Sequence, residues 1–436
     1  DTVDDPIART EIPLIQAEII RLLRLYAHNY SFKSYASSLL NYIDATLMDA
    51  NLVASGIPDD QFLAQIIAQN SDELPLKLKI GLGQLVVAEK PITAHWALAW
   101  ALSDPTIFKR KPVIRCEWEF GALFLQKYQE AYEAGFRLRK NKTRLMVDYW
   151  PVSSGLADKN FQQHFTGLPD VTALKTPINK LQKIVDDCTE VLEPYSRFIG
   201  RNPDKANALE ALLLLPVHLW PYKFQNIIRR IRRETQQQPE LLLLRELLSL
   251  FGQVDGLSRD RQLLFNQVLL QQRIGIEPDI TLGAKRLKPD DKVALFNTIA
   301  LAEEFKDTAD YQLAIVTIEL ACLVAHSDGG FLDKKQLFIQ DYIESLAAFS
   351  GSIKQRLRAH FVLSFEQPLP LGTFKKKLEP LALETRHSLA KLLIQLSLIE
   401  GAVASAKIKF LERIYKALGL ESKQLYSDLH ADESTT

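Results

Sequence analysis

The sequence predicts an all-α protein, made of multi-helical bundles with one small β-hairpin. Apolar residues recur every three or four positions over most of the chain, which is the period of an amphipathic helix. Glycine is scarce, with 18 in 436 residues, whereas a protein of many strands and tight turns would need more. One stretch, 136–149, instead alternates with the period of a strand, and it carries the hairpin prediction.

In the first half of the chain, helices are predicted where apolar side chains share one face and a proline or a capping residue precedes them. Proline suits a helix start, because its φ is already helical and the first turn needs no amide from it. Ser31 and Thr93 are the expected N-caps, since a hydroxyl oxygen can accept a hydrogen bond from a free amide of the first turn. The predicted helices are 13–26, 32–48, one starting at 58, 75–89, 93–104, 115–134, 177–192, 207–215 and 222–234.

Two segments interrupt this helical pattern. Residues 136–139 and 144–149 alternate around the polar stretch 140–143, which predicts the two arms and the turn of the hairpin. The prolines and the glycine of PYSRFIGRNP, at 194–203, predict a turn that ends the preceding helix.

The second half of the chain is also predicted to be helical. Helices are expected at 240–251 and 259–273, an extended piece at 274–280, and six or seven more helices between 290 and 430. The polar break QQQP, at 236–239, suggests a linker. We therefore predict an N-terminal helical domain over 1–235, a connecting helical region over 236–288 and a C-terminal helical bundle over 289–430.

The C-terminal region contains an internal repeat. HSDGGFLDKKQLFIQDYIESL, from His326, aligns with LIEGAVASAKIKFLERIYKAL, from Leu398, at a constant offset. Phe338 in the first copy matches Phe410 in the second. Each copy reads as a helix, an acidic residue followed by glycine, and a second helix, which is the pattern of duplicated helical hairpins packed on each other.

Charge and cysteine content exclude several classes of protein. Lys and Arg total 53, as do Asp and Glu, so the net charge is zero and the chain as a whole is not built to coat nucleic acid. Apolar runs such as 212–215 fall far short of the ~20 residues of a membrane span. Three cysteines cannot form a disulfide framework, so we expect a reducing, cytoplasmic setting. The opening DTVDDPIART has neither Met nor a signal segment, so we expect part of a longer or processed protein.

The sequence shows no grouping of residues that would carry catalysis or hold a cofactor. It lacks the GxxxxGK[ST] phosphate loop, the HExxH zinc motif and the GxSxG nucleophile motif. Cys116, Cys188 and Cys322 are all predicted to lie within helices, far from one another in sequence. We therefore predict that the protein is not an enzyme and binds no cofactor or metal.

Asp328 and Glu400 occupy the acidic-glycine turns of the repeat. Asp328 resembles the second half of an EF-hand loop, but that loop also needs oxygen ligands two and four residues earlier and a Glu seven residues later. Those positions here hold His326, Val324 and Lys335. The turns are interpreted as ordinary helix boundaries, with a residual acidic binding turn as the alternative.

Two clusters of basic residues are the candidate binding sites, and the first lies on the predicted hairpin. Like charges so close together repel one another, so we expect this cluster to contact an acidic partner, either protein or nucleic acid. The alternative is a solvated hairpin whose charges protect a strand edge. Its members are Arg137, Arg139, Lys140, Lys142 and Arg144.

The second basic cluster lies on the predicted helix 222–234. Arg229, Arg230 and Arg233 share one face of that helix, and Arg232 lies beside them. Such a face is usually solvated or paired with acids, and an anion or acidic-partner site is the alternative reading.

Several segments together resemble the TerB-N and TerB-C domains of the bacterial tellurite-resistance TerB-like family. The TerB-N resemblance rests on FGALF (120–124), LRKNKTRL (138–145), YWPVSSGL (149–156), LPDV (168–171) and PYSRFIGRNP (194–203). The TerB-C resemblance runs from GIEPD (275–279) to FLERIYKALGL (410–420).

The resemblance implies a mostly helical bacterial protein of a stress-response or phage-defence system. It implies a partner ATPase or helicase from the same operon, bound by a domain that does not itself catalyse. TerB domains carry acidic residues suspected of binding metal. Lys335 and Lys407 stand here where the family often has an acid, which argues against a metal site.

The sequence therefore leaves three functions open. The first is a non-catalytic adaptor that scaffolds an ATPase or helicase, which zero net charge favours. The second is a nucleic-acid-binding module that uses the basic clusters. The third is a TerB-type metal-binding stress protein.

Overall fold

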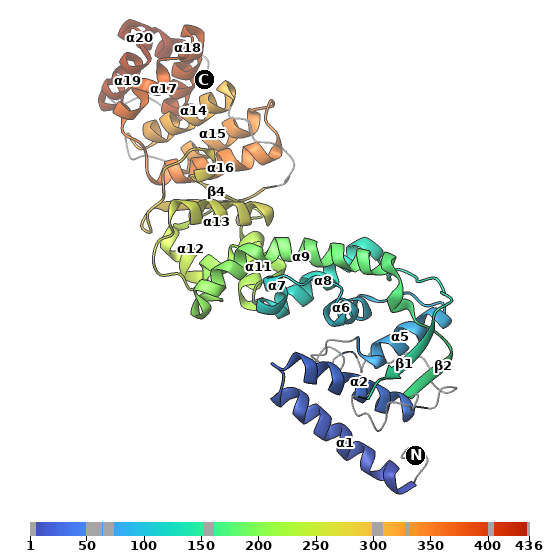
Figure 1. The fold of residues 1–436 in the computed structure, drawn as a ribbon. Helices are drawn as coiled ribbons and strands as arrows, with labels where there is room; N and C mark the ends of the chain where they lie inside the picture. The colour runs from blue at the N-terminus through green and yellow to red at the C-terminus, as the bar shows by residue number, and fades with distance from the viewer. Residues whose placement is uncertain are drawn as a thin grey trace. The chain divides into compact units, whose positions relative to one another are not determined.

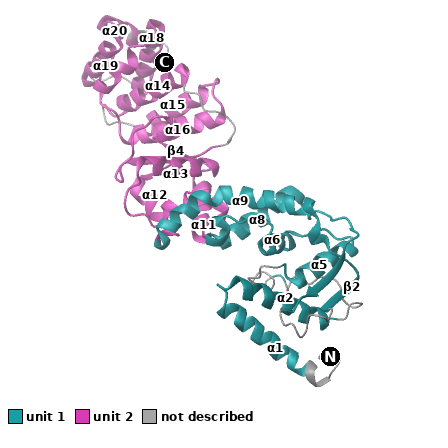
Figure 2. Ribbon diagram, viewed as in Figure 1, with its two compact units in different colours: residues 1–204 teal, residues 205–436 magenta. Residues whose placement is uncertain are grey.

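The computed structural model describes residues 6–48, 63, 74–151, 161–298, 308–327, 332–399 and 405–433. Figure 2 shows its two compact units, residues 1–204 and 205–436. Helices dominate both units, and the strands form only a two-stranded and a three-stranded sheet in the described ranges, which confirms the all-α prediction (Figure 1). The predicted domain limits at 235 and 288 differ from this division and stay a prediction.

Most helices of unit 1 lie where the apolar spacing predicts them, but the first runs through Pro13, and the helix predicted over 115–134 is two helices that meet at Cys116. The helix predicted to start at 58 lies outside the described residues. The others are α1 (Pro6–Leu25), α2 (Tyr30–Thr46), α5 (Leu76–Val87), α6 (Ala94–Ser103), α7 (Lys111–Arg115), α8 (Glu117–Tyr132) and α9 (Lys175–Arg201). The cap of α2 is Asn29, not Ser31, because the Asn29 side chain accepts from the amide of Phe32.

The hairpin exists, and its predicted arm 144–149 is confirmed, but the other arm is not the predicted one. β1 (Arg144–Tyr149) pairs antiparallel with β2 (Phe161–Pro169), beside α2 and α5 (Figure 1). The predicted first arm, 136–139, makes only a single bridge, from Phe136 to Ile92. The carbonyl of Phe136 accepts from the Ile92 amide, and its own amide donates to the Tyr128 hydroxyl, so neither group is left for a ladder with β1.

The turn predicted at 194–203 is also wrong, because α9 continues through Pro194 to Arg201. A proline inside a helix removes one hydrogen bond and costs ~3 kcal/mol or more. Leu192 and Tyr195 on either side of it are buried, and burying side chains of this size contributes ~2 kcal/mol each. The packing of the apolar face therefore outweighs the proline penalty.

Unit 2 begins with short helices and a sheet that the sequence analysis only partly predicted. The helices are α10 (Leu209–Leu212), α11 (Tyr222–Glu234), α12 (Leu244–Leu250) and α13 (Arg259–Gln271), and the strands are β3 (Glu240–Leu243), β4 (Ile274–Glu277) and β5 (Lys292–Asn297) in the order β3-β5-β4. β4 confirms the extended piece, whereas β3 and β5 were wrongly expected to be helical. Residues 293–296 of β5 are buried on both faces, and such a continuous apolar run has no period that separates strand from helix.

The rest of unit 2 is a helical bundle around one core. No helix in the described residues of either unit combines the length and the apolar character that crossing a membrane requires. The helices of the bundle are α14 (Ala309–Ala325), α15 (Leu332–Ser345), α16 (Gly351–Glu366), α17 (Lys375–Leu378), α18 (Leu383–Leu398), α19 (Ser405–Leu418) and α20 (Ser422–Glu433).

The internal repeat of the sequence is visible in two buried lysines. Lys335 on α15 donates to the carbonyl oxygen of Ala325 at the end of α14, at 3.3 Å. Lys407 on α19 donates to the carbonyl oxygen of Ser397 near the end of α18, at 2.9 Å. The four helices are thus two copies of one hairpin. In each copy, a lysine ammonium meets the negative end of the helix dipole.

A chain of buried charges ties the sheet of unit 2 to the bundle. Arg356 on α16 lies 3.0 Å from a carboxylate oxygen of Glu277 and 3.0 Å from one of Asp279. One turn later, His360 places Nδ1 3.6 Å from Glu277 Oε1 and Nε2 3.3 Å from Glu319 Oε1. A neutral imidazole would turn a lone pair toward one of these carboxylates, so their positions favour the imidazolium form.

The titration of this network follows from its contacts. Burial by itself would lower the pKa of His360, but the carboxylates of Glu277 and Glu319 outweigh it and raise that pKa to about 9. Burial likewise favours a higher pKa for Glu319, yet the neighbouring His360 and Lys377 bring the pKa below its ordinary value. The folded protein therefore favours the charged form of both His360 and Glu319.

We predict that His360→Gln destabilises unit 2 by about 3 kcal/mol near neutral pH, because it leaves two buried carboxylates facing an uncharged amide. The contribution of His360 is complete below pH ~6.5 and is lost as the pH rises through about 9, since the folded pKa lies above the unfolded one. Thermal unfolding of both proteins between pH 6 and 10 measures this. His387→Gln on α18 is the matched control. Equal midpoints for the parent and His360→Gln at pH 7 would contradict the assignment.

Candidate functional site

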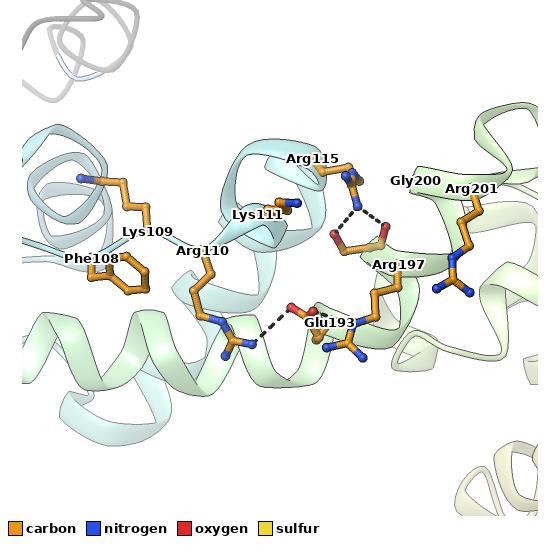
Figure 3. Close-up of a pocket in the computed structure, with 10 residues that line it drawn as sticks. Phe108, Lys109, Arg110, Lys111, Arg115, Glu193, Arg197, Gly200 and Arg201 are labelled. Carbon is orange, nitrogen blue, oxygen red and sulfur yellow. Dashed lines mark hydrogen bonds and ion pairs between the residues drawn. The ribbon is translucent and has the colours of Figure 1, made fainter.

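A strongly charged hollow lies in unit 1 and has a volume of about 670 Å³. Two segments far apart in the sequence line it, one before and within α7 and the other on α9 (Figure 3). Six of the lining residues are cationic and one is a carboxylate. We call it the basic pocket, lined by Phe108, Lys109, Arg110, Lys111, Arg115, Glu193, Ser196, Arg197, Gly200 and Arg201.

The amphipathic pattern of α9 decides which of its residues reach the basic pocket. Leu192 and Tyr195 are buried in unit 1. Glu193, Arg197 and Arg201 recur every four residues and form one stripe on another face. Burial of the apolar face therefore fixes the position of the charged stripe.

Glu193 is the centre of the basic pocket, because arginines from both segments approach it (Figure 3). The Nε of Arg197 lies 2.7 Å from one carboxylate oxygen, and a guanidinium nitrogen of Arg110 lies 3.4 Å from the other. Both arginine side chains are more than two-fifths exposed, so the two ion pairs contribute little to stability. They do hold two guanidinium groups on the same side of the pocket.

Arg115 occupies the wall of the basic pocket and depends on a glycine. Its Nη1 donates to the carbonyl oxygen of Ser196 at 2.8 Å, across the α7–α9 contact. A Cβ at position 200 would lie 2.4 Å from that same nitrogen. Gly200 thus leaves room for the guanidinium to lie flat against α9.

The three remaining cations behave differently from one another. Lys109 turns its ammonium away from the basic pocket, toward the carbonyl oxygens of Asp104 and Ile107, and burial lowers its pKa (Figure 3). Lys111 and Arg201 are exposed and have no ion-pair partner among the described residues. These two side chains are therefore available to a ligand.

The first predicted cluster is exposed, but it does not form the basic pocket. Arg137, Arg139, Lys140, Lys142 and Arg144 all face solvent, with Arg144 opening β1 and the other four in the irregular segment before it. Arg137 and Arg139 line a second hollow of about 420 Å³, together with Lys180 of α9 and Phe136. The binding role of this cluster stays a prediction.

The second predicted cluster lies in unit 2 on α11, as expected, with Arg229, Arg230, Arg232 and Arg233 exposed. Arg229 lies over the ring of Tyr222, 5.0 Å from its centre, and Arg230 lies 3.7 Å from Glu234. Its role in binding an anion also stays a prediction.

Asp328 and Glu400 lie outside the described residues, so the acidic turns are not described. No group of three potential metal-ligating side chains occurs within the described ranges. Cys116 and Cys188 are buried free thiols, and burial raises their pKa values to about 11 and about 12. Cys322 is buried as well, and burial raises its pKa further. None of the three is an activated nucleophile, because the thiolate is the reactive form.

The basic pocket could not be recognised in the sequence for two reasons. FKRK at 108–111 and the arginines of 194–203 are separated by more than eighty residues, and only the packing of α7 on α9 joins them. The arginines were also assigned to a turn, where they would not form a stripe. The usable signal was the spacing Glu193, Arg197, Arg201, which is the four-residue repeat of a helix face.

We predict that Gly200→Ala gains no stability, whereas Gly121→Ala on α8 gains about 1 kcal/mol. Alanine is the better helix former by that amount, and a Cβ at 121 meets nothing nearer than Leu98 at 3.8 Å. At 200 the new methyl displaces Arg115 and breaks its bond to Ser196, which offsets the gain. Thermal unfolding of the two variants measures the difference. Equal stabilisation of both would show that Arg115 moves without cost.

A family model matches the N-terminal part of the chain. Residues 2–113 match the model of the TerB N-terminal domain, a range that includes α1, α2, α5, α6 and the pocket residues 108–111 but not Arg115. The segments that carry the resemblance between 120 and 203 lie beyond this match. Searches of curated proteins and of solved structures found no match. Residues 2–113 of this chain are thus a TerB-like domain.

Proposed function

We propose that this chain is a non-catalytic adaptor that holds a negatively charged group of its partner in the basic pocket of unit 1. One observation carries the proposal: two distant segments bring five cationic groups and a single carboxylate around one hollow, the ammonium of Lys109 being turned away. An anion entering the pocket meets guanidinium groups that Glu193 and Ser196 already hold in place. Such preorganisation lowers the entropic cost of binding.

The fold gains little from this arrangement of charges. Arg197 and Arg201 are like charges four residues apart on one helix, a spacing that is slightly destabilising. Lys111 and Arg201 form no ion pair in the described structure. A negatively charged partner accounts for charges that stability does not require.

The TerB-like domain supports a tellurite-resistance-like context for this adaptor. We propose a cytoplasmic stress-response or phage-defence role, with an ATPase or helicase from the same operon as the partner. Direct contact with nucleic acid is the second candidate, and the cationic lining of the pocket favours it. A TerB-type metal site is the third, and the buried ammonium groups of Lys335 and Lys407 argue against it, because they would repel a divalent cation.

We predict that the double reversal Lys111→Glu/Arg201→Glu weakens polyanion binding at least tenfold. The probes are a fluorescent oligoglutamate and a single-stranded oligonucleotide, titrated at 50 and 200 mM salt. Each lost contact with a phosphate also lowers the salt slope of oligonucleotide binding by ~0.7. Both side chains are exposed, so the melting temperature should change little.

Arg139→Glu/Lys142→Glu is the matched variant, because it makes the same change in charge at two exposed residues of the first predicted cluster. If this pair alone reduces binding, the predicted cluster is the contact and the basic pocket is not. If neither pair affects either probe, the proposed function is wrong.

We also predict that the purified chain hydrolyses neither ATP nor GTP. The sequence lacks the loop whose backbone amides would hold the phosphates of a nucleotide for transfer. A coupled phosphate-release assay measures this, with and without the oligonucleotide. Hydrolysis that persists after a second, orthogonal purification step would show that the protein is an enzyme. The proposal of a non-catalytic adaptor would then be wrong.

A further inference from the structure

We propose that the basic pocket binds one nucleotide unit of a single-stranded nucleic acid, with its phosphates on the arginines and its base stacked on Phe108. This rests on the second candidate function, direct contact with nucleic acid, and names the ligand of the same site. The ring of Phe108 lines the basic pocket and is 67% exposed. The juxtaposition of an exposed aromatic ring with several cations is the chemistry by which proteins hold unpaired bases.

The exposure of Phe108 is imposed by a rigid loop. Its amide donates to the side-chain oxygen of Gln182 on α9 at 2.7 Å, and its carbonyl accepts from the nitrogen of the same side chain at 3.1 Å. Asp186 accepts from that nitrogen as well, at 2.9 Å, which fixes the orientation of the amide. The residue before Phe108, Ile107, is buried. The backbone is therefore clamped on both sides while the ring faces solvent.

Because the ring of Phe108 is exposed, the fold lacks the ~2 kcal/mol of stabilisation that burying a side chain of this size would contribute. The ring also loses little conformational entropy when a ligand stacks on it, since the backbone is already fixed. Phe108 and Arg110 extend from the same segment, and both line the basic pocket (Figure 3). A base on the ring would thus place its phosphate near the guanidinium of Arg110.

The arginines provide more than one phosphate position. Arg110 and Arg197 flank Glu193 from opposite segments, and Arg201 lies one turn further along α9, about 6 Å away along the helix axis. A guanidinium fork pairs well with phosphate oxygens. Arg201, which has no ion pair in the described structure, suits a neighbouring phosphate of the same strand.

An acidic peptide fits the basic pocket less well than a nucleotide unit does. A carboxylate side chain would use the cations but leave Phe108 without a partner. The volume of about 670 Å³ lies in the range of sites for small organic ligands, ~300–1,000 Å³. A base within a duplex is stacked on both faces and cannot reach the ring, so the ligand is a single strand.

The test compares two probes of equal charge on the full chain, a fluorescent twelve-residue oligothymidylate and an abasic strand of the same length. The parent should bind the thymidylate more tightly. Phe108→Leu keeps apolar bulk but removes the π-face, and it should weaken thymidylate binding about fivefold or more while leaving the abasic strand unchanged, since stacking contributes ~1–3 kcal/mol per base. Trp150→Leu is the control, because Trp150 is 76% exposed and follows the first predicted cluster.

The outcomes separate this inference from the proposed function. Equal affinity of the parent for both strands would overturn base stacking, while the sensitivity of either strand to Lys111→Glu/Arg201→Glu would still support an anion site. A fivefold loss with Trp150→Leu in place of Phe108→Leu would move the nucleic-acid site to the first predicted cluster and overturn the inference. Tighter binding of oligoglutamate than of thymidylate would make the partner an acidic protein. If the parent binds none of these polyanions, both proposals are wrong.

Discussion

The burial of one face of α9 is the constraint on which unit 1 depends. Apolar residues repeat along this face over most of the 27-residue helix, and α6, α7 and α8 pack against it. Burying side chains such as Leu181, Val185 and Leu192 at ~2 kcal/mol each is enough to carry the helix through Pro194. The same packing fixes the rotation of α9 about its axis. That rotation directs Arg197 and Arg201 into the basic pocket and Gln182 to the backbone of Phe108.

Unit 2 depends on buried charges as well as on apolar packing. Arg356 and His360, one turn apart on α16, neutralise carboxylates that come from β4 and α14. Removing one member of such a network leaves an uncompensated charge, which costs more than the intact network contributes. Lys335 and Lys407 repeat one contact in two helical hairpins. In both units, therefore, long cationic side chains join segments that are distant in the sequence.

Most helices of the fold could be predicted from the sequence, and the exceptions have physical causes. α11 was predicted over 222–234, with its three buried residues spaced four and three positions apart. β5 was missed because its four central residues are buried on both faces, which removes the alternation of a strand. The first arm of the hairpin was misplaced because the backbone carbonyl and amide of Phe136 are hydrogen-bonded to Ile92 and Tyr128. Local pattern cannot reveal a competing partner elsewhere in the chain.

The sequence by itself determined that this protein is helical, that its C-terminal region repeats a helical hairpin, and that its basic residues are clustered. These are properties of neighbouring residues, and the periods of helix and repeat can be read locally. The tertiary structure decided which cations meet. Arg110 and Arg197 share Glu193 only because α7 packs on α9, and Arg115 lies against α9 only because residue 200 has no Cβ. Convergence of side chains from distant segments is a consequence of packing, which acts between residues that the sequence keeps far apart.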